Sequence, residues 1–387
     1  MNRRHFVRSS CLGTAGLLFK SAVSIGENVP SRSGPPIVTV HGHLPGKPSP
    51  SGIPGLYPGR VVEVFHSRAI ERNRVSQPVV GRMLEQGMKE LTGESSAAAA
   101  WRKFVDPSDV VGIKINSSGA PRCCSSPEIV REVIHALRAI GVPEHNVVVY
   151  DRYSHEIDMG SYQTLLPVGT RVMGIEHGAL DASRYDLSVY CDANFFGEWE
   201  TRSYIARLIT EELTKIINVP TMKDHCASGV TGCLKNLGFG SFNNVARAHQ
   251  QPYTFTDPFI GYLCSTEPLR SKTVLHIMDG LRELWHGGPI PRSMDFVLEA
   301  KTLFLGTDPV AIDSIELEAI EEKRLAEGAL SLWDQDPKNL TTDSEEFLRN
   351  SRKNTYYRQP GHIAGAGKLG LGIFDRKQID YRQIQLT

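Results

Sequence analysis

The chain has 387 residues, of which 40% are hydrophobic and 22% are charged, a composition typical of globular proteins and not of disordered or fibrous ones. Its 43 Lys and Arg residues balance its 43 Asp and Glu residues, and no basic run interrupts the sequence, so we expect no nucleic-acid partner. The length is enough for one large domain or two smaller ones.

The first thirty residues have the features of an export signal. Arg3 and Arg4 are followed by Phe6 and then by a short, weakly apolar stretch at 11–19. A charged start, a short apolar stretch and small residues are typical of a targeting peptide, and the arginine pair indicates the twin-arginine (Tat) route. We therefore predict a Tat signal peptide at residues 1–30, with the Tat translocase as export partner and a periplasmic mature protein. The alternative is a chance arginine pair at a disordered terminus.

No other segment offers the roughly 20 consecutive apolar residues that a membrane-spanning helix needs, so we expect no transmembrane helix in the mature chain. Residues 31–59 are rich in Pro and Gly and are predicted to form an arm or linker. Within it, His41 and His43 would share a face of an extended chain and could bind a metal. The alternative is that both histidines are simply solvated.

From residue 60 onward the pattern alternates between strands and helices. Strands are predicted at 60–66, 109–115, 146–150, 213–219, 271–278 and 296–305, and helices at 76–91, 126–140, 257–269 and 309–326. Strands separated by helices of this length indicate parallel β-α-β units. We predict a single large α/β domain at 60–387, with a mostly parallel or mixed sheet flanked by helices in a Rossmann-like layered architecture.

Polar residues are expected at the carboxyl ends of these strands, where ligands bind in such sheets. The candidates are Lys114, Asn116, Asp151, Lys223, His225, Asp279, Asp308 and Asp313. Two predicted helices begin with a cap followed by proline, at Ser126 and at Asp308. Asp313 lies one turn further into its helix, where capping is unavailable, and we assign it a catalytic role.

The segment after the apolar strand that ends at Val219 holds the densest group of candidates. Lys223 and His225 are two residues apart, so both face one side if the strand continues, and we predict them to be catalytic. A glycine-rich turn at 229–232 then precedes Lys235 and Asn236. A turn that leads into a helix N-terminus suits an anion, so Lys235 and Asn236, together with Lys114 and Asn116, are predicted to bind the ligand. The alternative is a solvated surface loop capped by Thr231.

Two sets of residues could hold a metal. Asp151, Asp279 and Asp308 offer oxygen ligands for a divalent cation, provided that the strand order brings them together. Cys123, Cys124, Cys226 and Cys233 could supply thiolates to an iron–sulfur cluster or zinc. Their spacing differs from known cluster motifs, which favours structural or disulfide roles.

Several motifs together resemble a family, the domain of unknown function 362. They are VVGIKIN at 110–116, SPEIVREVIHALRAIGV at 126–142, NVVVYDR at 146–152, INVPTMKDH at 217–225, GVTGCLKNLGFG at 229–240 and DPVAID at 308–313. The similarity runs from about residue 60 to the C-terminus. The resemblance implies an iron–sulfur role, because many members of that family carry a ferredoxin-like cysteine module. This chain has no such module.

Three functions follow from these observations. The first is an exported enzyme that binds an anionic small molecule, and possibly a divalent metal, at the carboxyl ends of its strands, with Asp279, Asp308 or Asp313 as metal ligand or general base. The second is an iron–sulfur redox protein that uses the four cysteines. The third is a non-catalytic binding protein of the cell envelope.

Overall fold

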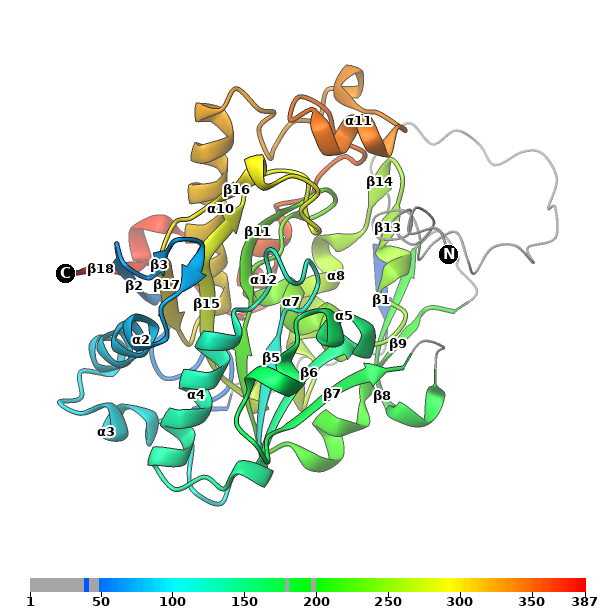
Figure 1. Ribbon diagram of the computed structural model, residues 1–387. Coiled ribbons are helices and arrows are strands. Elements are labelled where there is room, and N and C mark those ends of the chain that lie inside the picture. The colour runs from blue at the N-terminus through cyan, green and yellow to red at the C-terminus, as the bar shows by residue number, and fades with distance from the viewer. Residues whose placement is uncertain (1–37, 42–48, 178–180, 196–199) are drawn as a thin grey trace, which may run out of the picture.

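A computed structural model describes residues 38–41, 49–177, 181–195 and 200–387 of the chain. The predicted signal peptide and His43 lie outside the described residues, as does the side chain of His41. Figure 1 shows a central sheet with helices on both faces. This arrangement confirms the predicted α/β class.

The central sheet has eleven strands and is mixed. Eight of them form the order β18 (Asp380–Leu386), β2 (Arg60–His66), β17 (Thr302–Gly306), β15 (Thr273–Leu284), β10 (Lys215–Val219), β5 (Val111–Ile115), β6 (Val147–Tyr153) and β7 (Arg171–Glu176). From β15 to β7 every neighbouring pair is parallel, whereas β17 is antiparallel to both β2 and β15. The parallel half therefore carries the strand ends at which a ligand site was predicted.

Three short strands extend the sheet beyond the parallel half. The chain continues after β10 through Pro220 into β11 (Thr221–His225), which pairs with β15 and with β12 (Gly229–Val230). The third, β16 (Val297–Leu298), pairs with the far end of β15. Lys223 and His225 thus lie on an extended strand, where alternate side chains share a face.

The helices form two layers. One face carries α2 (Gln77–Thr92), α3 (Ala97–Trp101) and α4 (Pro127–Ala139), and the other carries α7 (Gly232–Ser241), α8 (Thr256–Ser265), α10 (Pro309–Ala326) and α12 (His362–Lys368) (Figure 1). Side chains of a strand alternate between the two cores that result. On β6, for example, Val147 and Val149 join the α2–α4 core, and Val148 and Tyr150 join the α7–α10 core.

A second sheet of three strands lies beside the main one. It consists of β1 (Val38–His41), β8 (Tyr185–Phe195) and β9 (Arg202–Ala206). Because β1 pairs antiparallel with β8, residues 38–41 of the predicted arm form an edge strand of this sheet. The remaining elements are β3 (Ile70–Glu71), β4 (Arg74–Val75), α5 (Ser154–Met159), α6 (Tyr162–Leu165), β13 (His249–Gln250), β14 (Tyr253–Thr254), α9 (Leu269–Lys272) and α11 (Ser344–Arg349).

Three predicted boundaries were wrong. The helix expected at 257–269 ends at Ser265, because Pro268 disfavours helical geometry in the residue before it. The strand expected at 296–305 is divided into β16 and β17, and Lys301 between them has a φ of 59°. The strand expected to end at 278 continues to Leu284.

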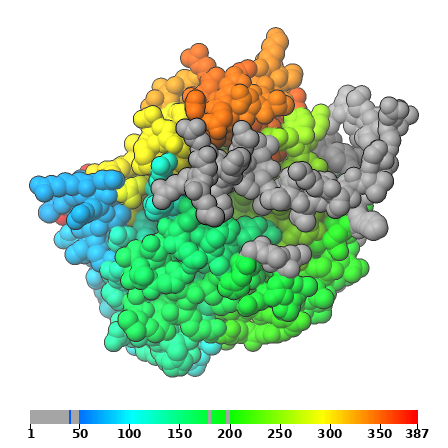
Figure 2. Space-filling model, turned by 45° about the vertical axis from the view of Figure 1, so that its right-hand side comes forward, coloured from blue at the N-terminus to red at the C-terminus, as the bar shows by residue number. Residues whose placement is uncertain are grey.

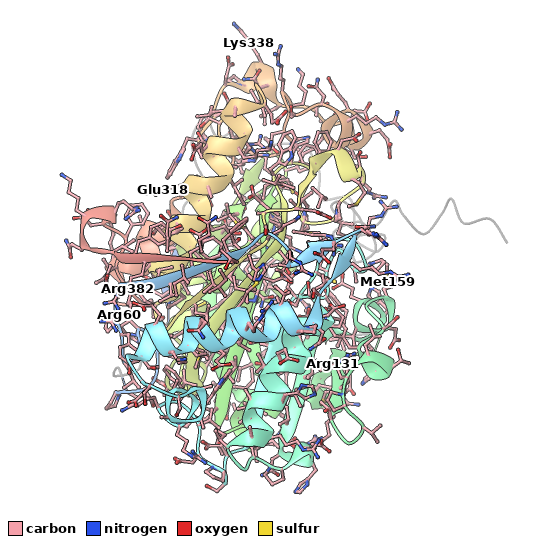
Figure 3. The ribbon with its side chains drawn as sticks, turned by 60° about the vertical axis from the view of Figure 1, so that its left-hand side comes forward. Arg60, Arg131, Met159, Glu318, Lys338 and Arg382 are labelled. Carbon is pink, nitrogen blue, oxygen red and sulfur yellow. The ribbon has the colours of Figure 1, made fainter. Side chains whose placement is uncertain are left out.

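The segment around α11 forms one raised end of the molecule, drawn in orange in Figure 2. Across the residues that the structure describes, no helix has both the length and the apolar character needed to cross a membrane. Among the side chains labelled in Figure 3, Met159, Glu318 and Lys338 are exposed, and Lys338 lies at the top of that view.

Candidate functional site

A row of buried polar side chains crosses four neighbouring strands under α7. Tyr150, Lys114, Asn218 and His276 stand in register on β6, β5, β10 and β15, and all are 0% exposed. The residues between them along the strands, such as Ile113 and Ile217, belong to the opposite core. Buried polar groups are costly unless they are hydrogen-bonded, so this row needs partners.

Helix α7 supplies partners for Lys114 and Asn218, whereas Tyr150 Oη and His276 Nε2 have no hydrogen-bond partner among the described residues. The Asn236 side chain accepts from Lys114 Nζ (3.1 Å) and from Asn116 Nδ2 (2.9 Å), and donates to Asn218 Oδ1 (2.8 Å). Asn218 in turn donates to the carbonyl of Cys233 at 2.9 Å and lies 3.0 Å from His276 Nδ1. Asn236 therefore joins the strand ends to the middle of the sheet.

Lys114 is a fully satisfied buried ammonium group. Its Nζ donates to Asp151 Oδ1 (2.7 Å), to the Ile115 carbonyl (2.5 Å) and to Asn236. The other Asp151 oxygen accepts from the Ser117 amide and hydroxyl at 2.8 and 2.7 Å. Burial works to raise the pKa of Asp151, but the Lys114 charge and the Ser117 hydrogen bonds outweigh burial and hold that pKa below its usual value. Burial lowers the pKa of Lys114, although Asp151 opposes that change.

Lys223 is equally buried but is held differently. Its Nζ donates to Asn116 Oδ1 and, at 2.6 Å, to the Ser118 carbonyl. Among the described residues, no carboxylate lies within ion-pair distance of this nitrogen, in contrast to the pairing of Lys114 with Asp151. Burial lowers the pKa of Lys223.

Besides Asp151, three ionisable side chains lie around Lys223. Glu156 on α5 is half-buried, and burial together with the Asp151 charge raises its pKa to about 7. Burial also raises the pKa of the Cys123 thiol to about 12 and that of Cys124 to about 11, so both are protonated at neutral pH. Glu156 is therefore the group near Lys223 that titrates near neutrality.

His225 lies between Lys223 and Lys235. Its Nδ1 accepts the amides of Ala227 (3.1 Å) and Ser228 (3.3 Å), so the ring is neutral and carries its proton on Nε2. Burial, Lys235 and His249 all lower the pKa of His225 well below its usual value. The His249 ring lies 5.3 Å from that of His225, and the Lys235 Nζ lies 4.4 Å from the centre of Phe239.

The N-terminus of α7 already has a carboxyl group of the chain itself, that of Asp313, and burial raises the pKa of this group to about 7. The carboxylate of Asp313, from α10, accepts the amides of Cys233 and Leu234 at 2.5 and 2.9 Å. Thr231 makes no side-chain cap bond. Gly232 has a φ of 57°, and a Cβ there would overlap the Asp313 carboxylate. The helix start predicted to bind an external anion is thus filled by the chain itself.

Gly240 is needed where α7 crosses the strand ends. A Cβ at this position would overlap Cε and Nζ of Lys114. The glycine therefore allows the helix backbone to approach the buried lysine.

The carboxylates proposed as metal ligands are dispersed. Asp308 accepts the amide of Ala311 at 2.9 Å and thus caps α10, as predicted. It also accepts the amides of Gly59 and Ile373. Asp279 lies inside β15 opposite Leu303, not at a strand end as expected. It accepts the amide of Ser126 at 2.7 Å, and Ser126 itself makes no side-chain cap bond.

The cysteines are likewise dispersed. Cys226 packs in a small cluster with Phe347, whereas Cys233 lies in the α7–α10 core. Within the part of the chain that the structure describes, no three His, Cys, Asp or Glu side chains are grouped as metal ligands, and no disulfide joins any two of the six cysteines there. Neither predicted metal set is brought together, and metal binding stays a prediction that metal analysis of the purified protein would test.

The opposite side of β11 also carries excess positive charge. Asp224 is fully buried, and its Oδ2 lies 3.3 Å from both Arg324 and Arg358. Two guanidinium groups thus share one carboxylate. The second guanidinium group makes this side of β11 favourable for further negative charge.

Sequence reasoning found Lys114, Asn116, Lys223 and Asn236 but missed several members of the site. The sequence does give a signal for Asn218, because it is the polar residue inside an apolar strand. It gives no signal for Glu156, because the segment at 152–200 has neither a helical nor a strand periodicity. The nearness of Ser117 to Asp151 follows only from the pairing of β5 with β6.

The family model for domain of unknown function (DUF362) matches residues 111–318, which is more than half of the chain. A search of curated proteins found no match. The matched region begins at β5 and ends within α10, so it contains Lys114, Asp151, Lys223, Asn236 and Asp313. The buried lysine site thus lies inside the matched region, and the chain belongs to the DUF362 family.

Proposed function

We propose that the protein is an enzyme that binds a small anionic substrate beside Lys223 and moves protons with Lys223 and Glu156. The observation that carries this proposal is the contrast between the two buried lysines. All three donor positions of Lys114 are filled by protein oxygens, whereas Lys223 uses two. The third position of Lys223 is where a substrate atom would bind.

The charge around β11 supports an anionic substrate. The Lys114–Asp151 pair is neutral overall and the buried histidines are neutral, while the protonated form of Lys223 has no carboxylate within ion-pair distance among the described residues. A buried positive charge without a counter-ion is costly, so an anion that approaches it is bound strongly. Side-chain pKa values moved toward neutrality, such as that of Glu156, are typical of acid–base catalysts.

A thermal-shift titration tests this proposal. Phosphate, sulfate and malonate are each added to the purified protein at low ionic strength, and the melting temperature is followed. We expect a saturable rise for the wild type, because a ligand that binds only the folded state stabilises it. Lys223→Met should abolish the rise.

The matched control is Lys338→Met, which removes the same charge from an exposed site (Figure 3). It should leave the titration unchanged. Equal responses from the wild type and Lys223→Met would contradict the proposal. Non-saturable responses would also contradict it, since they indicate general salt effects.

We further propose that the protein is exported by the Tat translocase and acts in the periplasm. The support is the Arg3–Arg4 pair followed by an apolar stretch. Cell fractionation of the wild type and of an Arg3→Lys/Arg4→Lys variant tests this. Export of both forms in equal amounts would argue against the Tat route.

A further inference from the structure

The hydrogen bonds of Lys223 match a neutral amine. An ammonium group has three N–H donors, and Lys114 places all three on protein oxygens. A neutral lysine has two N–H donors and one lone pair. Lys223 has two acceptors, Asn116 Oδ1 and the Ser118 carbonyl, so its neutral form satisfies both donors and leaves the lone pair at the third position.

The surroundings of Lys223 favour the same state. The residue is 0% exposed, and its two acceptors are uncharged amide oxygens, whereas Lys114 has the Asp151 carboxylate at 2.7 Å. Burial without a counter-ion lowers the pKa of Lys223. Desolvated lysines of this kind are the ones that act as nucleophiles toward carbonyl groups.

Lys223 is 0% exposed, but three of its neighbours are half-buried, namely Ser118, Cys124 and Glu156. A substrate that enters past these residues meets Glu156 together with Lys223.

We propose that Lys223 Nζ forms an imine with the carbonyl carbon of the anionic substrate. This step rests on the proposed function and names its substrate class, a small anionic aldehyde or ketone. The lone pair attacks the carbonyl carbon and forms the C–N bond, and the carbonyl oxygen takes up a proton while Nζ loses one. The C–O bond then breaks, the hydroxyl leaves as water with a proton from Glu156, and the remaining Nζ proton passes to the Glu156 carboxylate, which restores the acid. Water is the sole by-product, and nothing is oxidised or reduced.

Reductive trapping tests this inference. The full-length protein is incubated with pyruvate or succinic semialdehyde and then with sodium borohydride, and the modified lysines are located by peptide mass spectrometry. We expect the label on Lys223. Lys223→Met should lose it, and Glu156→Gln should slow labelling by about 100-fold, the lower range for general acid catalysis.

Two controls keep the result interpretable. Malonate, which is anionic but has no reactive carbonyl, should protect Lys223 in the wild type, so this readout needs no variant. Acetone, a neutral ketone, should label poorly. Circular dichroism and the melting temperature establish that each variant is folded.

Label that is absent from Lys223, or spread over exposed lysines such as Lys338, would overturn the inference. The proposed function would survive that outcome if the thermal shift with malonate still depended on Lys223. Absence of both the label and the anion effect would remove the inference and the proposed function together.

Discussion

The two faces of the central sheet have opposite chemistry. Toward α2 and α4 the strands present Ile113, Ile217 and their apolar neighbours, which form an ordinary core. Toward α7 the same strands present Lys114, Asn218 and His276 at 0% exposure. Apolar side chains at those positions would stabilise the fold at least as well. The polar face therefore marks where the fold accepts a cost in stability, which is typical of functional sites.

The largest effect is expected on the polar face, from Lys114→Met. The variant leaves the Asp151 carboxylate buried without its partner, so we expect a loss of roughly 3–5 kcal/mol in the free energy of unfolding, as for other broken buried pairs. Denaturant unfolding measures it. Adding Asp151→Leu to Lys114→Met should recover most of the lost free energy of unfolding. A double variant that is no more stable than Lys114→Met would show that the loss does not come from the broken ion pair.

An apolar deletion on the other face sharpens the contrast. Ile217→Ala removes buried methyl groups from the α2–α4 core, and we expect a loss of about 2–5 kcal/mol. The thermal shift produced by malonate should remain, because Ile217 belongs to the apolar α2–α4 core and is not among the hydrogen-bond partners of Lys223. If that shift were lost, the two faces would not be separable in function.

Gly240→Ala tests the close approach of α7. The added methyl group overlaps the Lys114 ammonium, so either the helix or the lysine must move, at a cost of about 1–3 kcal/mol typical of overpacking. The matched control is Gly93→Ala, since Gly93 has no atoms near an added Cβ, although its φ of 76° adds backbone strain. A Gly240→Ala variant as stable as the wild type would show that the contact is loose.

The smallest effect concerns the pH dependence of stability. The folded protein retains the Glu156 proton up to about pH 7, whereas the unfolded chain releases it near the ordinary value of 4.5. The folded state thus binds more protons between these values, so stability falls as the pH rises from about 4.5 to about 7. Glu156→Gln should make this decline shallower in unfolding experiments at several pH values.

Part of the decline should remain in that variant, because burial also raises the pKa of Glu283 to about 7. Glu283→Gln is therefore the companion variant and should reduce the slope by a separate amount. An identical pH profile for the wild type and Glu156→Gln would show that Glu156 releases its proton at its ordinary pKa.

The fold class, and the residues of the candidate site that lie close together, could be predicted from the sequence because both depend on local patterns. Strand–helix alternation indicated the α/β sheet, and polar residues after apolar strands indicated Lys114 and Lys223. The prediction that Asp308 caps a helix is also confirmed, because capping depends on residues that are close in the chain.

Other features depended on contacts between distant segments. Asp313 caps a helix that begins 81 positions earlier in the chain, and nothing in its own helix indicates this (313 − 232). Asp279 was taken for a strand end because β15 continues beyond the point where its apolar run stops. Lys114 and Lys223 have different hydrogen-bond partners because different strands lie beside them. The order of the strands is set by the topology of the sheet and not by the local sequence.

The Asp313 carboxylate also has a consequence for the biosynthesis of the protein. Strands β5, β6, β7 and β10 and the α7 segment emerge from the ribosome before α10 does, yet the amides of Cys233 and Leu234 lack the Asp313 carboxyl group until α10 has folded against them. A C-terminally shortened chain that ends before α10 would therefore leave these two amides without that acceptor, even where the parallel strands had formed.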